Sequence, residues 1–147
     1  MEKDKKALVF LGLAVVAGIF IVLTGPLFVL RNLTFLMVEI FGMLLIIWAL
    51  LAQKVNKKHT RHDLPDGYFF LNKGPYEIIR HPVYAGILLI MSSLIEYDFA
   101  ALRVLAFCIM IAAFVMKMLR EEYALGQKIK EYEEYKKNTK YLIPYLF

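Results

Sequence analysis

Residues 7–30 read ALVFLGLAVVAGIFIVLTGPLFVL, a run without a charged residue that follows a highly charged start. At a rise of about 1.5 Å per residue, a helix of this length crosses the roughly 30 Å of hydrocarbon in a lipid bilayer. Three further apolar runs follow it along the chain. We therefore expect an all-α integral membrane protein with about four transmembrane helices, at residues 7–30, 33–51, 77–95 and 99–118.

The composition of the whole chain agrees with a membrane location. Of 147 residues, 60% are hydrophobic and 14% are aromatic, and the mean hydropathy is +0.57. A soluble domain of this length cannot bury so large an apolar fraction. The length of the first run, its lack of a small-residue cleavage pattern and the second run behind it favour a retained helix over a secretory signal. Residues 1–147 contain no internal repeat and are interpreted as one membrane-embedded domain.

Positive charges are concentrated in three segments, and their distribution predicts the topology. They lie in the first six residues, in the loop at residues 52–76 with its flank up to His81, and in the C-terminal tail at residues 119–147. The positive-inside rule puts these segments, both termini and hence the active site on the cytoplasmic side. The net charge of +5 then reflects topology and attraction to anionic membrane lipids, and nucleic-acid binding explains it poorly.

The cysteine and histidine content gives little support for disulfide or metal chemistry. Cys108 is the single cysteine, so no disulfide can form within the chain, and we expect a small buried hydrophobe. His59 and His62 have a spacing that suits two metal ligands on one helical face, with Asp63 beside them. Because they lie in a lysine-rich loop without further ligands nearby, we predict a solvated interfacial face and no metal.

One ionisable residue, Glu39, falls within the second apolar run. Intramembrane carboxylates are costly and are functional by default. The alternative is a structural hydrogen bond to a neighbouring helix or burial in the protonated form. The role of Glu39 stays open, and we do not assign it to a site.

A polar segment, GPYEIIRHPVYAG at residues 74–86, lies where the basic loop meets the third apolar run. Pro75 and Pro82 disfavour the helical conformation in the residues that precede them, so we expect a fixed turn and then a helix with Pro82 in its first position. The free N–H groups of that helix start, together with Arg80, suit a carboxylate or a phosphate. The alternative is a basic and aromatic anchor at the membrane interface.

An acidic pair, Glu121 and Glu122, follows the fourth apolar run, against the basic bias of this side of the membrane. Such a pair needs a cationic partner. After it, Leu125, Ile129 and Tyr132 recur at helical spacing, and the sequence finishes with YLIPYLF at residues 141–147. We expect this apolar end to fold back over the bundle as a lid, the alternative being an interfacial helix with an apolar tail.

These residues, in this order, resemble the integral-membrane methyltransferases, which include isoprenylcysteine carboxyl methyltransferases and phospholipid N-methyltransferases. The pattern G-P-Y-x-x-x-R-H-P-x-Y-x-G, a further apolar hairpin, the Glu-Glu pair, Tyr132-x-x-Tyr135 and Pro144 all match, over roughly residues 73–147. The resemblance implies S-adenosylmethionine as methyl donor, in a pocket formed by the last two spans and the folded-back tail. By position it assigns the following residues to the cofactor site: Tyr76, Arg80, His81, Pro82, Tyr84, Gly86, Glu121 and Glu122.

The charges of this donor fit the assignment. Its sulfonium and ammonium suit carboxylates and tyrosine faces, whereas its carboxylate suits Arg80 or His81. Opposite charges at opposite ends of the site would fix the direction of the donor.

The chain departs from the family pattern at two places. Ile129-Lys130 stands where relatives have Phe-Gly, and the spacing from Glu121 to Tyr132 is about one residue short. This spacing leaves open an alignment of the acidic pair with Arg120-Glu121, and with it the role of Glu122. Lys140-Tyr141 stands where relatives have an arginine before the final proline. Lys140 is a weaker substitute for that arginine, because it cannot make a bidentate fork.

The sequence does not specify the methyl acceptor. A carboxylate needs no base near pH 7, whereas an amine must first lose a proton, and the candidate bases are Glu121, Glu122, His81 and Tyr135. We assign catalytic roles to Glu121, Tyr135 and Lys140. The expected acceptor is a lipid-like amphipathic molecule, either an isoprenylcysteine-type carboxylate or a phospholipid amine.

Two other functions remain as alternatives. One is an NADPH-dependent membrane reductase, although the chain lacks a glycine-rich phosphate fingerprint. The other is a non-catalytic membrane subunit that associates through Ala14 and Gly18, whose spacing suits helix packing. We expect a monomer or a weak dimer.

Overall fold

The computed structural model describes residues 2–25, 32–57, 71–97, 100–129 and 131–143. Within these ranges the only β-structure is one isolated bridge between Ile79 and Lys140, so the expected all-α class is confirmed for the described part. The elements are α1 (Glu2–Leu23), α2 (Leu33–Lys57), the short 3-10 helix η2 (Gly74–Glu77), α3 (Pro82–Tyr97), α4 (Ala101–Lys128) and α5 (Glu131–Asn138).

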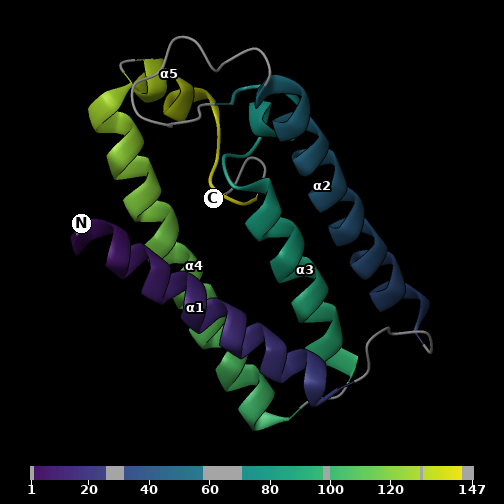
Figure 1. Ribbon diagram of the computed structural model, residues 1–147. Coiled ribbons are helices and arrows are strands. Elements are labelled where there is room, and N and C mark those ends of the chain that lie inside the picture. The colour runs from purple at the N-terminus through teal and green to yellow at the C-terminus, as the bar shows by residue number, and fades with distance from the viewer. Residues whose placement is uncertain (1, 26–31, 58–70, 98–99, 130, 144–147) are drawn as a thin grey trace.

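The four long helices form two pairs (Figure 1). α1 packs along α4, and α2 packs along α3. The pairs approach each other where α1 and α3 end and α4 begins, and α3 and α4 diverge toward the end of the bundle that carries α5 (Figure 1). The segment after α5, yellow in Figure 1, turns back between the diverging ends of α3 and α4.

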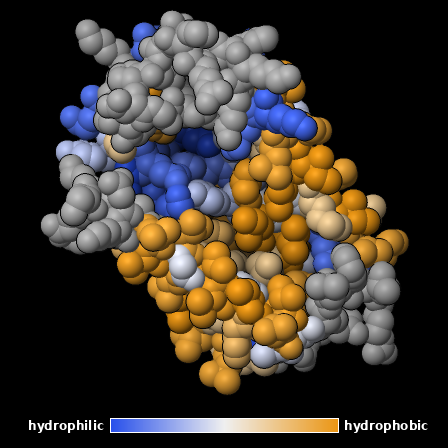
Figure 2. Space-filling model, viewed as in Figure 1, coloured by the Kyte–Doolittle hydropathy of each residue, from blue (hydrophilic) through white to orange (hydrophobic). Residues whose placement is uncertain are grey.

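Two of the helices can cross a membrane by their length and composition. They are α2, over Leu33–Val55, and α4, over Ala101–Gln127. The apolar stretches of α1 and α3, Leu8–Leu23 and Pro82–Glu96, are shorter. Hydrophobic side chains cover much of the coloured surface in Figure 2, and hydrophilic ones gather in a recess toward the α5 end. An apolar surface of this extent is typical of contact with lipid.

The first two helices differ in length from the expected spans. α1 ends at Leu23, and a bend at Gly25 follows; the Phe20 carbonyl in its last turn accepts from both the N–H (3.1 Å) and the hydroxyl (2.7 Å) of Thr24. Residues 26–30 of the expected span lie outside the described residues. α2 starts as expected after Asn32, whose Oδ1 accepts from the Thr34 N–H (3.0 Å), but it continues six residues beyond residue 51 to Lys57.

The other two helices also correct the expected boundaries. α3 begins at Pro82 and not at residue 77, because η2 ends at Glu77 and the backbone of residues 78–81 pairs with the tail. α4 runs to Lys128, ten residues beyond the expected end of its span at residue 118. The acidic pair therefore lies on α4 and not in a separate tail. The helical spacing expected from Leu125 to Tyr132 is interrupted at Ile129, whose extended conformation separates α4 from α5.

Small residues bring α1 and α4 into contact. Ala14 and Ala17 of α1 are buried against α4, where Ala113 and Met110 are buried as well. Ala14 therefore packs inside the chain, and its expected role in association with another molecule is wrong. Cys108, expected to be buried, is exposed on the surface of α4.

A glycine pair brings α2 and α3 into contact. A Cβ atom on Gly42 would lie 2.8 Å from the Gly86 carbonyl oxygen, and one on Gly86 would lie 2.7 Å from the Gly42 carbonyl oxygen. Such distances are too short for real atoms, so both positions need glycine. Gly86 therefore lies close to the backbone of α2.

Arg103 closes the end of the bundle that lies away from α5. Its side chain, 2% exposed, extends from the first turn of α4. Nη2 donates to the carbonyls of Leu94 (2.9 Å) and Ile21 (3.4 Å), in the last turns of α3 and α1. These carbonyls have few partners within their own helices, so one guanidinium joins three helix ends.

Candidate functional site

The segment before α3 adopts the turn that its prolines predict. Gly74 has a φ of 65°, a left-handed conformation that favours glycine, and its N–H donates to Glu77 Oε1 (3.3 Å). η2 follows with Pro75 in its first turn, and the Pro75 carbonyl accepts from the N–H groups of Ile78 and Ile79. The chain then extends until Pro82 starts α3. Arg80 and His81 are thereby held in the extended stretch between two helices.

The C-terminal segment pairs with this stretch in parallel. The Arg80 N–H donates to the Lys140 carbonyl (2.7 Å), and the His81 N–H donates to the Tyr141 carbonyl (3.1 Å). In return, the Lys140 N–H donates to the Ile78 carbonyl (3.2 Å). The expectation that the tail folds back is confirmed up to residue 143, whereas residues 144–147, including Pro144, lie outside the described residues.

The Arg80 guanidinium connects the tail to α4. Nε lies 2.5 Å from Glu122 Oε1, and the two side chains are only 6% and 4% exposed. Nη1 donates to the carbonyls of Thr139 (2.5 Å) and Lys136 (3.3 Å) at the end of α5. Arg80 therefore neutralises a buried carboxylate and caps a helix C-terminus at once.

His81 lies between the two carboxylates of the acidic pair. Its Nε2 is 3.4 Å from Glu122 Oε1, and its Nδ1 is 3.8 Å from Glu121 Oε2. Among the described residues, neither His81 Nε2 nor Glu122 Oε2 has a hydrogen-bond partner, although both atoms are buried. Buried polar atoms without a partner are uncommon and mark a place where a ligand or water can bind.

Glu121 carries a different set of contacts. The Lys117 ammonium, one turn earlier on α4, forms an ion pair with Glu121 Oε1. The Tyr84 hydroxyl lies 3.3 Å from the same oxygen, and Lys117 Nζ lies 5.8 Å from the centre of the Tyr84 ring. The preceding residue, Arg120, instead packs over Phe10 of α1. This geometry favours Glu121 and Glu122 as the functional pair over Arg120 and Glu121.

Four rings form a nearly parallel series from the tail into the bundle. Tyr141 and His81 have centroids 6.5 Å apart, His81 and Tyr84 5.6 Å, and Tyr84 and Phe114 4.7 Å, with interplanar angles of 14°, 10° and 16°. The Arg80 guanidinium carbon lies 4.1 Å from the Tyr141 ring centre. Ring faces next to cations show that this site can hold positive charge by cation–π contact as well as by carboxylates.

A layer of tyrosines supports the cluster from the α5 side. The Tyr135 hydroxyl donates to the Tyr76 carbonyl (2.6 Å), and Gln53 Nε2 donates to the Tyr76 hydroxyl (2.5 Å). Burial raises the pKa of Tyr76, Tyr132 and Tyr135 above the ordinary value for a phenol. These phenols stay protonated at neutral pH, which argues against Tyr135 as a base.

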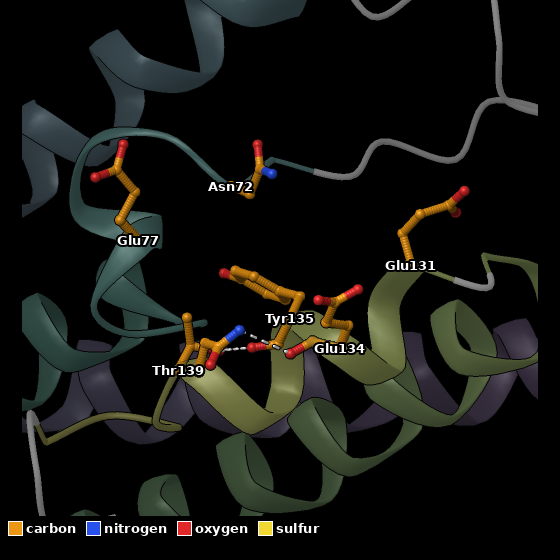
Figure 3. Close-up of a pocket in the computed structure, with 7 residues that line it drawn as sticks. Asn72, Glu77, Glu131, Glu134, Tyr135 and Thr139 are labelled. Carbon is orange, nitrogen blue, oxygen red and sulfur yellow. Dashed lines mark hydrogen bonds between the residues drawn. The ribbon is translucent and has the colours of Figure 1, made fainter.

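A polar pocket of about 310 Å³ lies outside this layer, between the segment before α3 and α5 (Figure 3). Tyr135 extends into it, with Glu77 on one side and Glu131 and Glu134 on the other. None of the buried cluster residues Arg80, His81, Glu121 and Glu122 lines this pocket. Its carboxylates are exposed to solvent, so we place the candidate site in the buried cluster instead.

The structure brings together five of the residues that the sequence assigned to the site: Arg80, His81, Tyr84, Glu121 and Glu122. The other assigned residues have supporting positions. Pro82 starts α3, Gly86 packs on α2, Tyr76 and Tyr135 form the supporting layer, and Lys140 has an exposed side chain and contributes through its backbone.

One expectation about the charges is wrong. Arg80 and Glu122 were expected at opposite ends of the site, but they are in direct contact because the cluster is buried and each charge needs a partner. Sequence reasoning also missed Lys117 and Thr139. The spacing of Lys117 and Glu121, four residues apart on one helix, is the signal that predicts their ion pair.

The loop histidines His59 and His62 and the neighbouring Asp63 lie outside the described residues. Comparisons of the chain with protein-family models, with curated proteins and with solved structures found no match.

Proposed function

We propose that the chain is a membrane-embedded methyltransferase that uses S-adenosylmethionine and a lipid-like acceptor. The observation that carries the proposal is the largely buried cluster of Arg80, His81, Glu121 and Glu122, with two buried polar atoms that lack a hydrogen-bond partner among the described residues. The resemblance of residues 73–147 to integral-membrane methyltransferases supports the same function. The donor would supply an electrophilic methyl group on a sulfonium sulfur.

The residues of the cluster fit this donor in their chemistry. Glu122 Oε2 can accept from an ammonium, and His81 Nε2 can bond a polar group of the ligand. The faces of Tyr84 and Tyr141 can hold positive charge. Arg80 holds Glu122 and the tail, so its role in the proposal is to position these groups and not to bind the carboxylate of the donor.

The protein would contribute alignment and the exclusion of water. Segment 139–143 pairs with the Arg80 and His81 backbone, and in this proposal it opens to admit the ligand to the buried atoms. Closure afterwards would keep water from the reacting groups, and a fixed geometry between two reactants can replace a large entropic cost.

The topology in this proposal has four crossings, with both termini and the cluster on the cytoplasmic side. α2 and α4 have sufficient length, and the shorter apolar parts of α1 and α3 pack along them. A bilayer can adapt to short helices by local thinning. Reporter fusions at the two ends of the chain would test the sidedness, since both should report a cytoplasmic position.

Binding of S-adenosylmethionine to the protein in lipid nanodiscs tests the function. Wild type should bind it and not NADPH, and Glu122→Gln and His81→Ala should reduce the affinity at least about tenfold, since charged hydrogen bonds contribute about 1.5–3 kcal/mol. Glu96→Gln, exposed at the far end of α3, is the matched control and should bind like wild type.

A second assay identifies the class of acceptor. Membranes that contain the protein are incubated with methyl-labelled donor, and the label is followed into base-labile esters or base-stable N-methyl lipids. Wild type that neither binds S-adenosylmethionine nor transfers label would reject the proposal.

A further inference from the structure

Lys117 is a cation in the candidate site that the methyltransferase resemblance does not assign. Its side chain is 15% exposed and its ammonium pairs with Glu121, whose side chain is 35% exposed. The ammonium also faces the Tyr84 ring, 5.8 Å from its centre. The Lys117 ammonium thus contacts both the Glu121 carboxylate and the face of the Tyr84 ring.

The two ion pairs of the cluster differ in how firmly the cation is held. Arg80 binds Glu122 and, in addition, two carbonyls at the end of α5. Lys117 is held by Glu121 and Tyr84, at the end of a flexible four-carbon chain. A ligand that brings its own positive charge into the cluster therefore displaces Lys117 more readily than Arg80.

The surroundings of the Lys117 ammonium match a sulfonium more closely than a ligand ammonium. A sulfonium has no N–H groups, so it is held by negative charge and by ring faces and not by hydrogen bonds. Glu121 and the Tyr84 ring offer these two contacts at one place. Glu122 Oε2, a buried acceptor without a partner, suits instead an ammonium that donates hydrogen bonds.

We propose that the Lys117 ammonium occupies the sulfonium subsite and acts as an internal counter-ion that S-adenosylmethionine displaces from Glu121. This inference rests on the proposed function. Lys117 is a positioning residue in this scheme: it keeps Glu121 neutralised and in place while the site is empty, and it competes with the donor. Its removal should therefore strengthen binding, whereas removal of a purely structural ion pair should weaken it.

The test compares two ligands that differ by the sulfonium charge. In nanodiscs at low salt, Lys117→Met should bind S-adenosylmethionine about fivefold more tightly than wild type, as expected for the loss of a competing partly exposed ion pair. S-adenosylhomocysteine, which lacks the sulfonium charge, should change by less than about twofold. Lys136→Met removes a more exposed lysine–glutamate ion pair, with Glu133 on α5, and should leave both affinities unchanged.

The outcomes separate the two proposals. Wild type that binds neither ligand overturns the proposed function and this inference together. If wild type binds both ligands, two results overturn the inference alone. Either Lys117→Met binds S-adenosylmethionine more weakly than wild type, or its affinity for the two ligands rises by the same factor.

A measurement on wild type tests the same inference if Lys117→Met fails to fold. The rate of acylation of Lys117 by an amine-reactive reagent, read by mass spectrometry, should rise when S-adenosylmethionine is added and should not rise with S-adenosylhomocysteine. An equal or lower rate with S-adenosylmethionine contradicts the displacement.

Discussion

Two buried arginines stand at opposite ends of the helix bundle. Arg103, 2% exposed, donates to carbonyls in the last turns of α1 and α3. Arg80, 8% exposed, donates to carbonyls at the end of α5 and also to the carboxylate of Glu122. Both residues solve the same problem, since helix C-termini leave backbone carbonyls without partners and buried carbonyls without partners are costly.

The difference between the two ends shows what distinguishes a candidate site from a structural joint. At the Arg103 end, a guanidinium draws helix ends together and leaves no room for a side chain at Gly25. At the Arg80 end, the helices diverge, and two carboxylates and an imidazole lie together with the guanidinium. A buried arginine alone is thus no sign of function, whereas a cluster of further titratable side chains around it is.

The largest expected effect on stability comes from removing the Arg103 side chain, whose contacts connect the ends of α1, α3 and α4. Arg103→Met should lower the free energy of unfolding by about 4 kcal/mol, because at least two buried carbonyls lose a charged donor. Thermal unfolding in detergent, followed by circular dichroism, measures it. An unchanged melting temperature would mean that apolar packing alone holds this end.

A slightly smaller and more local effect is expected at the Arg80 end. Arg80→Met should cost about 3 kcal/mol, because Glu122 stays buried without its cation. The tail should be released first, so limited proteolysis should cut segment 139–143 faster than in wild type. Arg80→Lys should restore the charge but not the carbonyl contacts, and a tail as protected as in wild type would contradict the proposed connection.

Glycine substitutions test how tightly the Arg103 end is closed. A Cβ atom on Gly25 would lie 2.2 Å from Arg103 Nη2, so Gly25→Ala should displace the guanidinium and cost about 2 kcal/mol. Gly12→Ala is the matched control on α1, since no atom lies within 4 Å of the added Cβ. Alanine favours helices, so Gly12→Ala should be neutral or stabilising; equal melting temperatures for the two variants would show that the Arg103 end tolerates a side chain.

The smallest effect concerns pH at the α5 end. Burial raises the pKa of Tyr132, so the stability that its phenol contributes is complete below the ordinary value near 10 and is lost as pH rises through the higher folded value. By pH 11 the loss should reach about 1 kcal/mol. Tyr132→Phe should remove this part of the decline in melting temperature; the same decline in both proteins would assign it to other groups.

The sequence predicts the four long helices well because each apolar run is long and contains few charged residues. It misplaces their ends for a physical reason. Glu121 and Glu122 lower the hydropathy of α4, although they take part in a largely buried cluster, so a hydropathy argument ends the helix too early. α1 was extended too far because Thr24 and Gly25 are uncharged, yet the chain bends at Gly25 directly after the helix.

The sequence predicts which residues belong to the candidate site better than it predicts how they are arranged. The need of the acidic pair for a cationic partner follows from its place among positively charged segments of the sequence, and the structure supplies Arg80 and Lys117. The direct contact of Arg80 with Glu122 could not be inferred, because it depends on how α3, α4 and the tail pack. The resemblance assigned Gly86 to the cofactor site, and only the distance to Gly42 shows that it packs against a helix.

The contact between Arg80 and Thr139 joins residues 59 positions apart, and it has a consequence for biosynthesis. A nascent chain that has emerged from the ribosome as far as residue 128 holds all four long helices, but not the carbonyls that Arg80 binds at the end of α5. Insertion of the helices and completion of the cluster are therefore separate events, with the second delayed until residues 136–141 are released. A translation arrest between the two would leave an inserted protein with an unfinished cluster, open to the cytoplasmic quality-control machinery if the proposed topology holds.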